Sequence, residues 1–336
     1  MNKIRKTVSV AITCILLWIC VSAMGHICRP VNTDITINAI NTFHDMPEDT
    51  FEVIAYGSSH VWRGLDPMEM YNEYGIGAYN YGCNWQQLNT TLLFLKDSMR
   101  TQKPKVALIE TYLVDLFKNN QNIDGEIYYT RAIKESSDKN EYLRQALGKN
   151  KERYLAYYMP LCAFHDNWVS LTENSFRWDF SYTYDFKKTM GFVKGDTATK
   201  IKIPNYELFE QKELSPNSRI ILDEIVKTCS EAGTKIIFYT APYQGTYSYT
   251  KAMRKYAEEK DSVYLNFFEL CGEAGIDEGT DFSDAGHLNT SGSRKMADYL
   301  GKYIADRYEV TDMRTIEGNI WETAKADPAD NLIDEL

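Results

Sequence analysis

Short apolar segments alternate with amphipathic helical patterns along most of this chain, and this alternation constrains the fold more than any other feature. The strand-like segments are residues 51–56, 78–81, 105–110, 235–240 and 262–267. The helical patterns are residues 67–74, 86–101, 218–232, 246–260 and 291–308. Strands that are apolar throughout are typical of a parallel sheet with helices on both faces. The sequence therefore predicts an α/β fold with a three-layer, doubly wound parallel sheet.

The rest of the chain divides around this sheet domain, which we expect to occupy residues 51–310. Between about residues 112 and 215 polar and aromatic side chains replace the strand pattern, which indicates an insertion of helices and loops that caps the site. Residues 29–50 are polar and contain two prolines, as a linker would. The acidic stretch 311–336 is typical of a solvated tail, with Trp321 as its one candidate anchor.

The N-terminus, residues 1–28, carries an apolar run from residue 8 to 25, roughly 18 residues and close to the minimum for crossing a bilayer. Three basic residues precede it: Lys3, Arg5 and Lys6. The positive flank favours a single-pass anchor with the remaining chain outside the cytoplasm. The small residues near Ala23 leave a second interpretation open, a signal peptide that is cleaved to release a secreted protein.

Net charge excludes one large class of partners. The chain carries a net charge of −10 with a pI near 5.2, whereas nucleic-acid binding needs clustered Lys and Arg. No set of His, Cys and carboxylate residues has the spacing of a metal site, so the sequence predicts neither a metal nor another cofactor.

Two short motifs carry the chemistry. Gly57-Ser58-Ser59 follows the first strand, and Asp284 stands three residues before His287, just ahead of the last helix. Each motif alone has an ordinary interpretation, the first as a helix cap and the second as a polar loop. In a doubly wound sheet, however, both positions open on the carboxyl edge of the strands. We therefore expect a serine nucleophile, a histidine base and an aspartate that orients the base.

These motifs give the chain a resemblance to the SGNH/GDSL hydrolase superfamily, and in particular to its membrane-anchored DltD-like branch. Gly57-Ser58-Ser59 is similar to the first block of that branch, which implies Ser59 as nucleophile within a flavodoxin-like sheet. The segment from Asp284 to His287 is similar to the last block, which implies both as catalytic residues. The segment 79–84 resembles the glycine block, which implies the Gly82 N–H as an oxyanion donor.

The third block of the superfamily, Gly-x-Asn-Asp, is missing. The strand 105–110 is followed by Thr111 and Tyr112, so the usual oxyanion asparagine is absent there. Asn84 either replaces it or is a turn residue. Glu110 either supports the catalytic residues from behind or simply ends its strand.

The resemblance implies an extracytoplasmic, membrane-tethered serine esterase or O-acyltransferase that acts on an acylated cell-envelope polysaccharide or a teichoic-acid-like polymer. A membrane-bound O-acyltransferase is a further partner that it allows. The alternative is a non-catalytic envelope assembly protein of the same fold, which binds a glycan or such an acyltransferase, and the missing asparagine favours it.

Four finer expectations follow from the residues. The Ser59 Oγ should lie within roughly 3–4 Å of the His287 ring. The pKa of His287 should be near its ordinary value of about 6.5, raised by Asp284. The ring of His60 should point away from the site. The cluster 164–168, with its aromatic and charged residues, either lines an acceptor groove or packs structurally.

Overall fold

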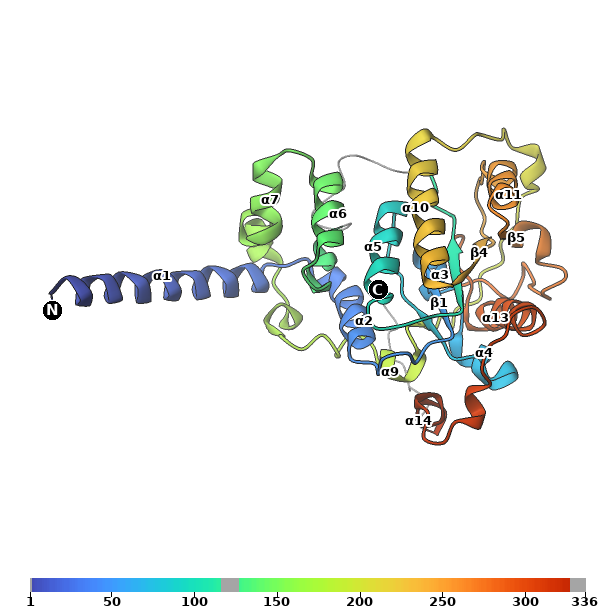
Figure 1. The fold of residues 1–336 in the computed structure, drawn as a ribbon, viewed down its shortest axis with the longest axis horizontal. Coiled ribbons are helices and arrows are strands. Elements are labelled where there is room, and N and C mark those ends of the chain that lie inside the picture. Colours follow the sequence, from blue (N-terminus) through green and yellow to red (C-terminus); the bar gives the residue numbers. More distant parts are fainter. Residues whose placement is uncertain (1, 116–126, 327–336) are drawn as a thin grey trace.

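The computed structural model describes residues 2–115 and 127–326. Its centre is a sheet of five parallel strands (Figure 1). The strands are β1 (Val53–Tyr56), β2 (Ala78–Asn80), β3 (Val106–Glu110), β4 (Lys235–Thr240) and β5 (Val263–Asn266). Their order in the sheet is β2-β1-β3-β4-β5, the flavodoxin-like order of a doubly wound fold. The predicted α/β class is therefore confirmed.

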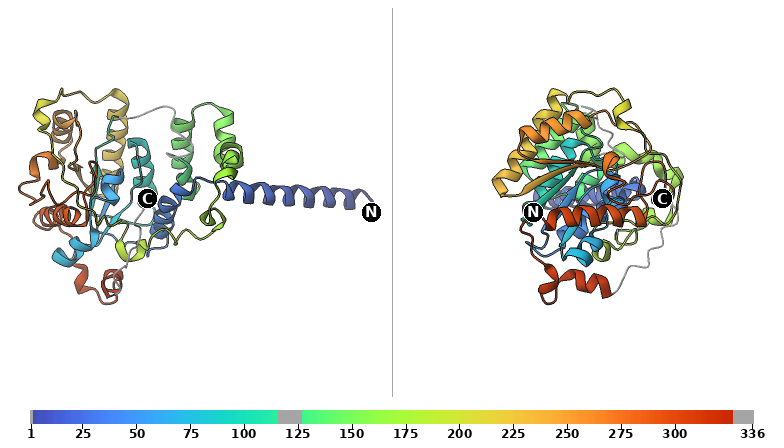
Figure 2. Two further views of the ribbon diagram at one scale, coloured as in Figure 1. Left: turned by 180° about the vertical axis from the view of Figure 1, so that it is seen from behind. Right: turned by 90° about the vertical axis from the view of Figure 1, so that its right-hand side faces the viewer.

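Helices cover both faces of this sheet (Figure 2). One face carries α5 (Leu88–Ser98), α10 (Pro216–Ala232) and α11 (Thr250–Glu259), and the other carries α4 (Pro67–Tyr74), α12 (Phe267–Leu270) and α13 (Thr290–Ala305). In β3, Ala107 and Ile109 point into the first core, while Val106 and Leu108 point into the second. Because successive strand residues face opposite sides, a strand between two helical layers must be apolar at every position.

The helix boundaries follow from local chemistry. At the start of α4, Asp66 accepts a hydrogen bond from the Met68 N–H, and Pro67 occupies the first turn. Gly75 ends α4 in the left-handed conformation, and Gly233 ends α10 in the same way. Short-range signals of this kind explain why the predicted and observed ends of these two helices nearly coincide.

The prediction of a polar linker at residues 29–50 is wrong. This segment contains η1 (Val31–Thr33) and α2 (Asp34–His44), most of whose residues are buried. Ile40 and Phe43 are fully buried in the first core, and the Phe43 ring stacks on Tyr81 at a centroid distance of 4.1 Å. Thr and Asn residues alternate with the apolar residues of α2, so the apolar face of this helix is not recognisable from the sequence. It is recognised only once the helix is seen packed against the core.

The described part of the insertion between residues 112 and 215 consists of short helices joined by loops, as expected; residues 116–126 lie outside the described residues. Its elements are η3 (Tyr128–Ala132), α6 (Ser137–Leu147), α7 (Lys151–Tyr158), α8 (Leu161–Phe164), η4 (His165–Ser170), η5 (Glu173–Phe176), α9 (Phe186–Thr189) and η6 (Tyr206–Leu208). Helix α6 packs on α5, where the Thr90 Oγ1 donates to the Tyr142 hydroxyl at 3.2 Å. The insertion thus adds a helical layer outside α5 (Figure 1).

The C-terminal segment is not a free tail up to residue 326. It forms η7 (Met313–Thr315) and α14 (Ile320–Ala326), and residues 327–336 lie outside the described residues. Trp321 is fully buried, with its ring 5.9 Å from that of Phe51 and 5.8 Å from that of Tyr71. Trp321 therefore anchors the segment 311–326, as the sequence suggested, and the prediction of a solvated tail is wrong for these residues.

Helix α1 (Asn2–Ile27) projects from the domain as one long rod (Figure 1). Its segment Ile4–Ile27 has a mean hydropathy of 2.3 and is almost entirely exposed. By length and composition it can cross a membrane. A signal sequence has the same features, so the choice between a retained anchor and a cleaved signal stays open.

Candidate active site

The turn after β1 depends on a glycine. Gly57 has a φ of +154°, and a Cβ on it would lie 2.5 Å from the Glu110 Cβ and 2.9 Å from the Val61 Cγ2. No real side chain tolerates contacts that close. Glycine therefore lets β1 turn directly into α3 (Ser59–Trp62) while passing against the end of β3.

The two serines of the first motif have different surroundings. Ser58 is buried, and its Oγ donates to the Glu110 Oε2 at 2.8 Å and accepts from the His60 N–H at 3.3 Å. Ser59 is partly exposed and lines a cavity. Ser58 also borders this cavity, but it is the helix cap considered in the ordinary interpretation, with 1% exposure and a hydroxyl that is already hydrogen-bonded. Ser59 is the more exposed of the two serines.

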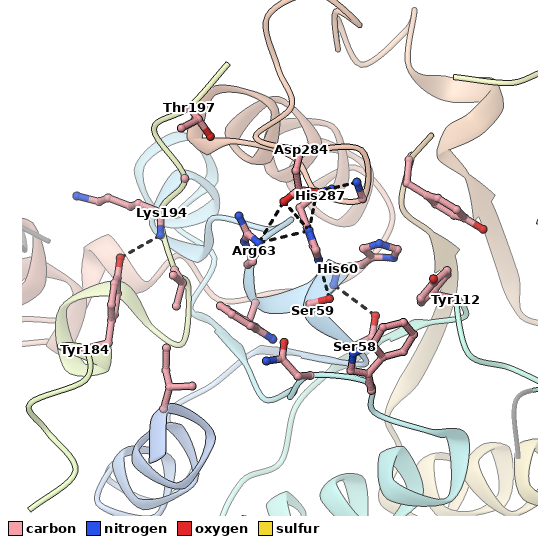
Figure 3. Close-up of a pocket in the computed structure, with 18 of the residues that line it drawn as sticks. Ser58, Ser59, His60, Arg63, Tyr112, Tyr184, Lys194, Thr197, Asp284 and His287 are labelled. Atoms are coloured by element: carbon pink, nitrogen blue, oxygen red, sulfur yellow. Dashed lines mark hydrogen bonds and ion pairs between the residues drawn. The ribbon is translucent and has the colours of Figure 1, made fainter. Parts of the chain in front are cut away.

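The structure brings Ser59, His287 and Asp284 together in a line (Figure 3). The Ser59 Oγ lies 2.8 Å from the His287 Nε2. The His287 Nδ1 lies 2.9 and 3.0 Å from the two Asp284 carboxylate oxygens. These contacts favour the tautomer in which Nδ1 donates to Asp284 and Nε2 is free to accept the serine proton. The arrangement can activate a serine hydroxyl.

A small closed loop holds Asp284 and His287 in place. Phe282 and Leu288 form an isolated antiparallel bridge, and both side chains are buried in the second core. The Asp284 Oδ1 also accepts the backbone N–H groups of Gly286 at 2.7 Å and His287 at 3.0 Å. Because the loop is pinned at both flanks, the histidine does not depend on Asp284 alone for its position.

The pKa of His287 is lowered, not raised as the sequence led us to expect. Burial is the largest cause, because it disfavours the charged imidazolium. The hydrogen bond that His287 donates to Asp284 acts in the opposite direction, while the electrostatic influence of His60 and of the Arg63 guanidinium lowers the pKa further. Asp284 itself has a pKa well below its usual range; burial opposes this shift, but hydrogen bonding and charge from His287 outweigh it. His287 is therefore a neutral base at pH 7.

Arg63 is a site residue that the sequence did not suggest. Its Nη1 lies 3.3 Å from the His287 Nδ1 and 3.4 Å from the Asp284 Oδ2, and its Nη2 donates to the Ser283 Oγ at 3.1 Å. Its position four residues after Ser59, one helical turn on, was the available signal. It links the two motifs and places a permanent positive charge beside the base.

Glu110, which stands where the third block begins, supports the nucleophile turn from behind. Its Oε2 accepts from both the backbone N–H and the Oγ of Ser58, and its Oε1 accepts from the Tyr112 N–H. Glu110 therefore does more than end its strand, because its carboxylate holds the backbone and the hydroxyl of Ser58. The carboxyl group does not contact Ser59, so it is a positioning group.

The expectation that the ring of His60 points away from the site is wrong. It packs 5.6 Å from the His287 ring, between Tyr112 at 4.4 Å and Tyr243 at 5.3 Å. Its Nδ1 is buried without a hydrogen-bond partner and lies 3.8 Å from the Glu110 Oε1. The ring therefore forms a wall beside His287, which adds to the burial of the base.

The two oxyanion candidates differ in position. Asn84 is an exposed residue in a turn, as one of its two interpretations had it, and it also lines the cavity that contains Ser59. Gly82 is buried and is not among the residues lining this cavity. It packs on the Gly57 carbonyl, since a Cβ there would lie 2.5 Å from the Gly57 oxygen. The donor role of the Gly82 N–H stays a prediction.

The cavity in front of Ser59 has a volume of about 930 Å³, at the upper end for small-molecule sites. Two of its walls come from outside the strands and helices of the sheet core: Asn32 of η1 with Ile35 of α2, and Tyr184 with residues 193–197 of the insertion. Figure 3 shows Tyr184 and Lys194 across the space from Ser59. The insertion thus borders the site, whereas the cluster 164–168 does not line it.

Comparisons with known proteins add little to this geometry. No protein-family model matches the chain, and no curated protein matches it. Among solved structures, it is similar to one from Bacteroides fragilis described as a "putative acylhydrolase", with 10% sequence identity and a TM-score of 0.38 over 79% of this chain and 93% of the other. A similarity of that size carries no argument about activity, so the functional case depends on the geometry of the site.

Proposed function

We propose that this protein is an SGNH-type serine esterase or O-acyltransferase that works through an acyl-Ser59 intermediate. The observation that carries the proposal is the 2.8 Å contact between the Ser59 Oγ and the His287 Nε2, with Asp284 on the other ring nitrogen. Residues separated by more than two hundred positions meet here in the order that acyl transfer needs.

The reaction has two steps. In the first, the Ser59 Oγ attacks the ester carbonyl while the His287 Nε2 takes its proton. The tetrahedral intermediate collapses, the carbon–oxygen bond to the leaving alcohol breaks, and His287 returns the proton to that alcohol. In the second step water or an acceptor hydroxyl repeats the attack on the acyl-serine, and Ser59 recovers its proton. Asp284 stabilises the imidazolium that forms twice in each cycle.

The oxyanion needs hydrogen-bond donors where the negative charge develops. We assign this role to the Ser59 and Gly82 N–H groups and to the Asn84 side chain. Asn84 then substitutes for the missing third-block asparagine, which is consistent with its place on the cavity wall. Loss of one such donor costs roughly 10²–10³ in kcat.

We further propose that the substrate is an acylated cell-envelope glycan or a teichoic-acid-like polymer. A large cavity that mixes aromatic walls, such as Trp85 and Tyr112, with polar groups suits a sugar better than a purely aliphatic chain. The membrane helix is the second support, because it would hold the enzyme where envelope polymers are acylated. The domain would then lie outside the cytoplasm.

A serine-directed fluorophosphonate tests the catalytic proposal most directly. The full chain in detergent should become labelled on Ser59, and Ser59→Ala should abolish the label. Ser58→Ala is the matched control and should still be labelled. Labelling that is absent in the wild type, while an envelope glycan still binds, would instead support the non-catalytic assembly protein.

A further inference from the structure

Exposed apolar side chains are concentrated on one part of the insertion. Among the described residues outside α1, nine large apolar side chains are at least 45% exposed, and six of these lie between residues 155 and 178. We call these six the aromatic patch: Leu155, Tyr158, Trp168, Val169, Phe176 and Trp178. Four of the six are aromatic. A soluble domain rarely leaves so many large apolar groups together in water, so the patch calls for a partner.

The aromatic patch surrounds the point where α1 joins the domain. The His26 ring, in the last turn of α1, stacks on Trp178 at a centroid distance of 3.8 Å. The Asn167 Nδ2 donates to the Cys28 carbonyl at 2.9 Å. Helix α8 packs against Gly25 so closely that a Cβ there would lie 3.0 Å from the α8 backbone. Figure 1 shows α7 beside this end of α1.

The length of α1 determines where the aromatic patch would lie relative to a bilayer that the helix crosses. The helix is free of contacts that bury it from Ile4 to about Met24, and Gly25 is its first buried residue. These 21 residues, counted from Ile4 through Met24, span about 31 Å at 1.5 Å per residue. The hydrocarbon core of a bilayer is about 30 Å thick. A bilayer around α1 therefore ends close to Gly25, at the level of the aromatic patch.

The junction between α1 and the domain is tied by a buried arginine. Arg29 pairs with the Asp34 carboxylate at 2.8 and 2.6 Å, and both side chains are fully buried. The same guanidinium donates to the carbonyls of Asn174 and Ser175, each at 2.9 Å. One side chain thus connects the end of α1, the start of α2 and the patch-bearing segment η5. These contacts tie the junction after α1 to the domain at several points.

We propose that the aromatic patch sits in the interfacial layer of the bilayer that α1 crosses, on the side of the membrane where the domain lies. Trp and Tyr side chains concentrate at that layer in membrane proteins. Residues 151–179 carry three basic and four acidic side chains, so attraction to anionic lipids is not the driving force. The burial of apolar side chains is the driving force, so the docking should hardly depend on lipid charge or salt.

The docked patch would hold the catalytic cavity at a fixed height above the membrane. Asn32 and Ile35, which line that cavity, come five and eight residues after the end of α1 at Ile27. The rigid junction at Arg29 lies between them and the membrane. The enzyme would then act on acyl groups within a narrow layer near the lipid surface.

Fluorine NMR on the full chain tests the proposal. The protein is labelled with 5-fluorotryptophan, reconstituted in phosphatidylcholine nanodiscs, and each of its six Trp signals is assigned by a Trp→Phe variant. A doxyl-labelled phosphatidylcholine is then added as a relaxation probe. Trp18, within α1, is the internal positive control, and the fully buried Trp321 is a negative control. A Leu208→Trp variant supplies an exposed control in η6, three residues before Gln211, which bonds to the Lys251 N–H of α11. Figure 1 shows α11 far from α1.

We expect the signals of Trp168 and Trp178 to lose at least about half their height, as Trp18 does, while the controls at positions 208 and 321 do not change. Replacing a third of the lipid with an anionic one should leave this result the same. Signals that ignore the doxyl lipid but are broadened by a water-soluble gadolinium chelate would overturn the proposal. So would protection from both probes, which means that a protein covers the patch, and so would an unaffected Trp18, which means that α1 is not in the bilayer.

Discussion

Replacing the two adjacent serines one at a time should separate chemistry from stability. Ser59→Ala removes the hydroxyl that contacts the His287 Nε2, and the proposed mechanism predicts a loss of roughly 10⁴–10⁶ in kcat. It removes one partly exposed hydrogen bond, worth about 0.5–1.5 kcal/mol of stability. Ser58→Ala leaves the nucleophile in place but takes a donor from the buried Glu110 carboxyl and an acceptor from the His60 N–H.

Glu110 keeps the hydrogen bonds from the Ser58 and Tyr112 N–H groups, so the main cost is the buried His60 N–H left without its acceptor, and Ser58→Ala should destabilise the fold by about 1–3 kcal/mol. At about 2–4 °C per kcal/mol, the melting temperature should fall by roughly 2–12 °C. The assay combines initial rates on p-nitrophenyl acetate with thermal melts of the full chain in detergent. The two variants should rank in opposite order in the two measurements. Equal loss of activity with an unchanged melting temperature for Ser58→Ala would refute the assignment, as would an acyl adduct trapped on Ser58.

Three further predictions follow. Because burial and neighbouring charge lower the pKa of His287, and only the neutral ring accepts the Ser59 proton, kcat/KM should fall as pH drops through a midpoint below about 6.5. Arg63→Met removes one of the charges that lower this pKa, so its pH–rate midpoint should move to higher pH, whereas Arg294→Met, which alters a salt bridge to Asp66, should leave the midpoint unchanged. Gly57→Ala places a Cβ 2.5 Å from the Glu110 Cβ, so it should cost about 1–3 kcal/mol or more in thermal melts and most of the activity, while Gly272→Ala, with no atom within 4 Å of its Cβ, should change neither. Trp321→Ala removes a fully buried side chain and should lower the free energy of unfolding by about 3–5 kcal/mol. A chain truncated before residue 311 that keeps the wild-type melting temperature would contradict this prediction.

The sequence alone was enough to predict a parallel sheet and the approximate ranges of its five strands. Each strand had to be apolar on both faces, and the two ends of α4 had local signals in Asp66 and Gly75. These features depend on residues close together in the chain, so they can be recognised in the sequence without a structure. The same holds for the two motifs, because the ends of parallel strands share one edge of the sheet.

What the sequence did not reveal depends on contacts between distant residues. Helix α2 has a mixed polar sequence, and only its packing against Tyr81 shows that it belongs to the core. The support of Ser58 by Glu110 requires β1 and β3 to be neighbours, with their carboxyl ends in register.

The electrostatics of the site were likewise decided by tertiary structure. From the sequence, Asp284 was the only visible influence on His287, and it raises the pKa. The fold added burial, the His60 ring and the Arg63 guanidinium, which together outweigh it. Local sequence thus determined which groups form the candidate site, while their protonation, which depends on solvent access and on charges from other segments, was determined only when the chain folded.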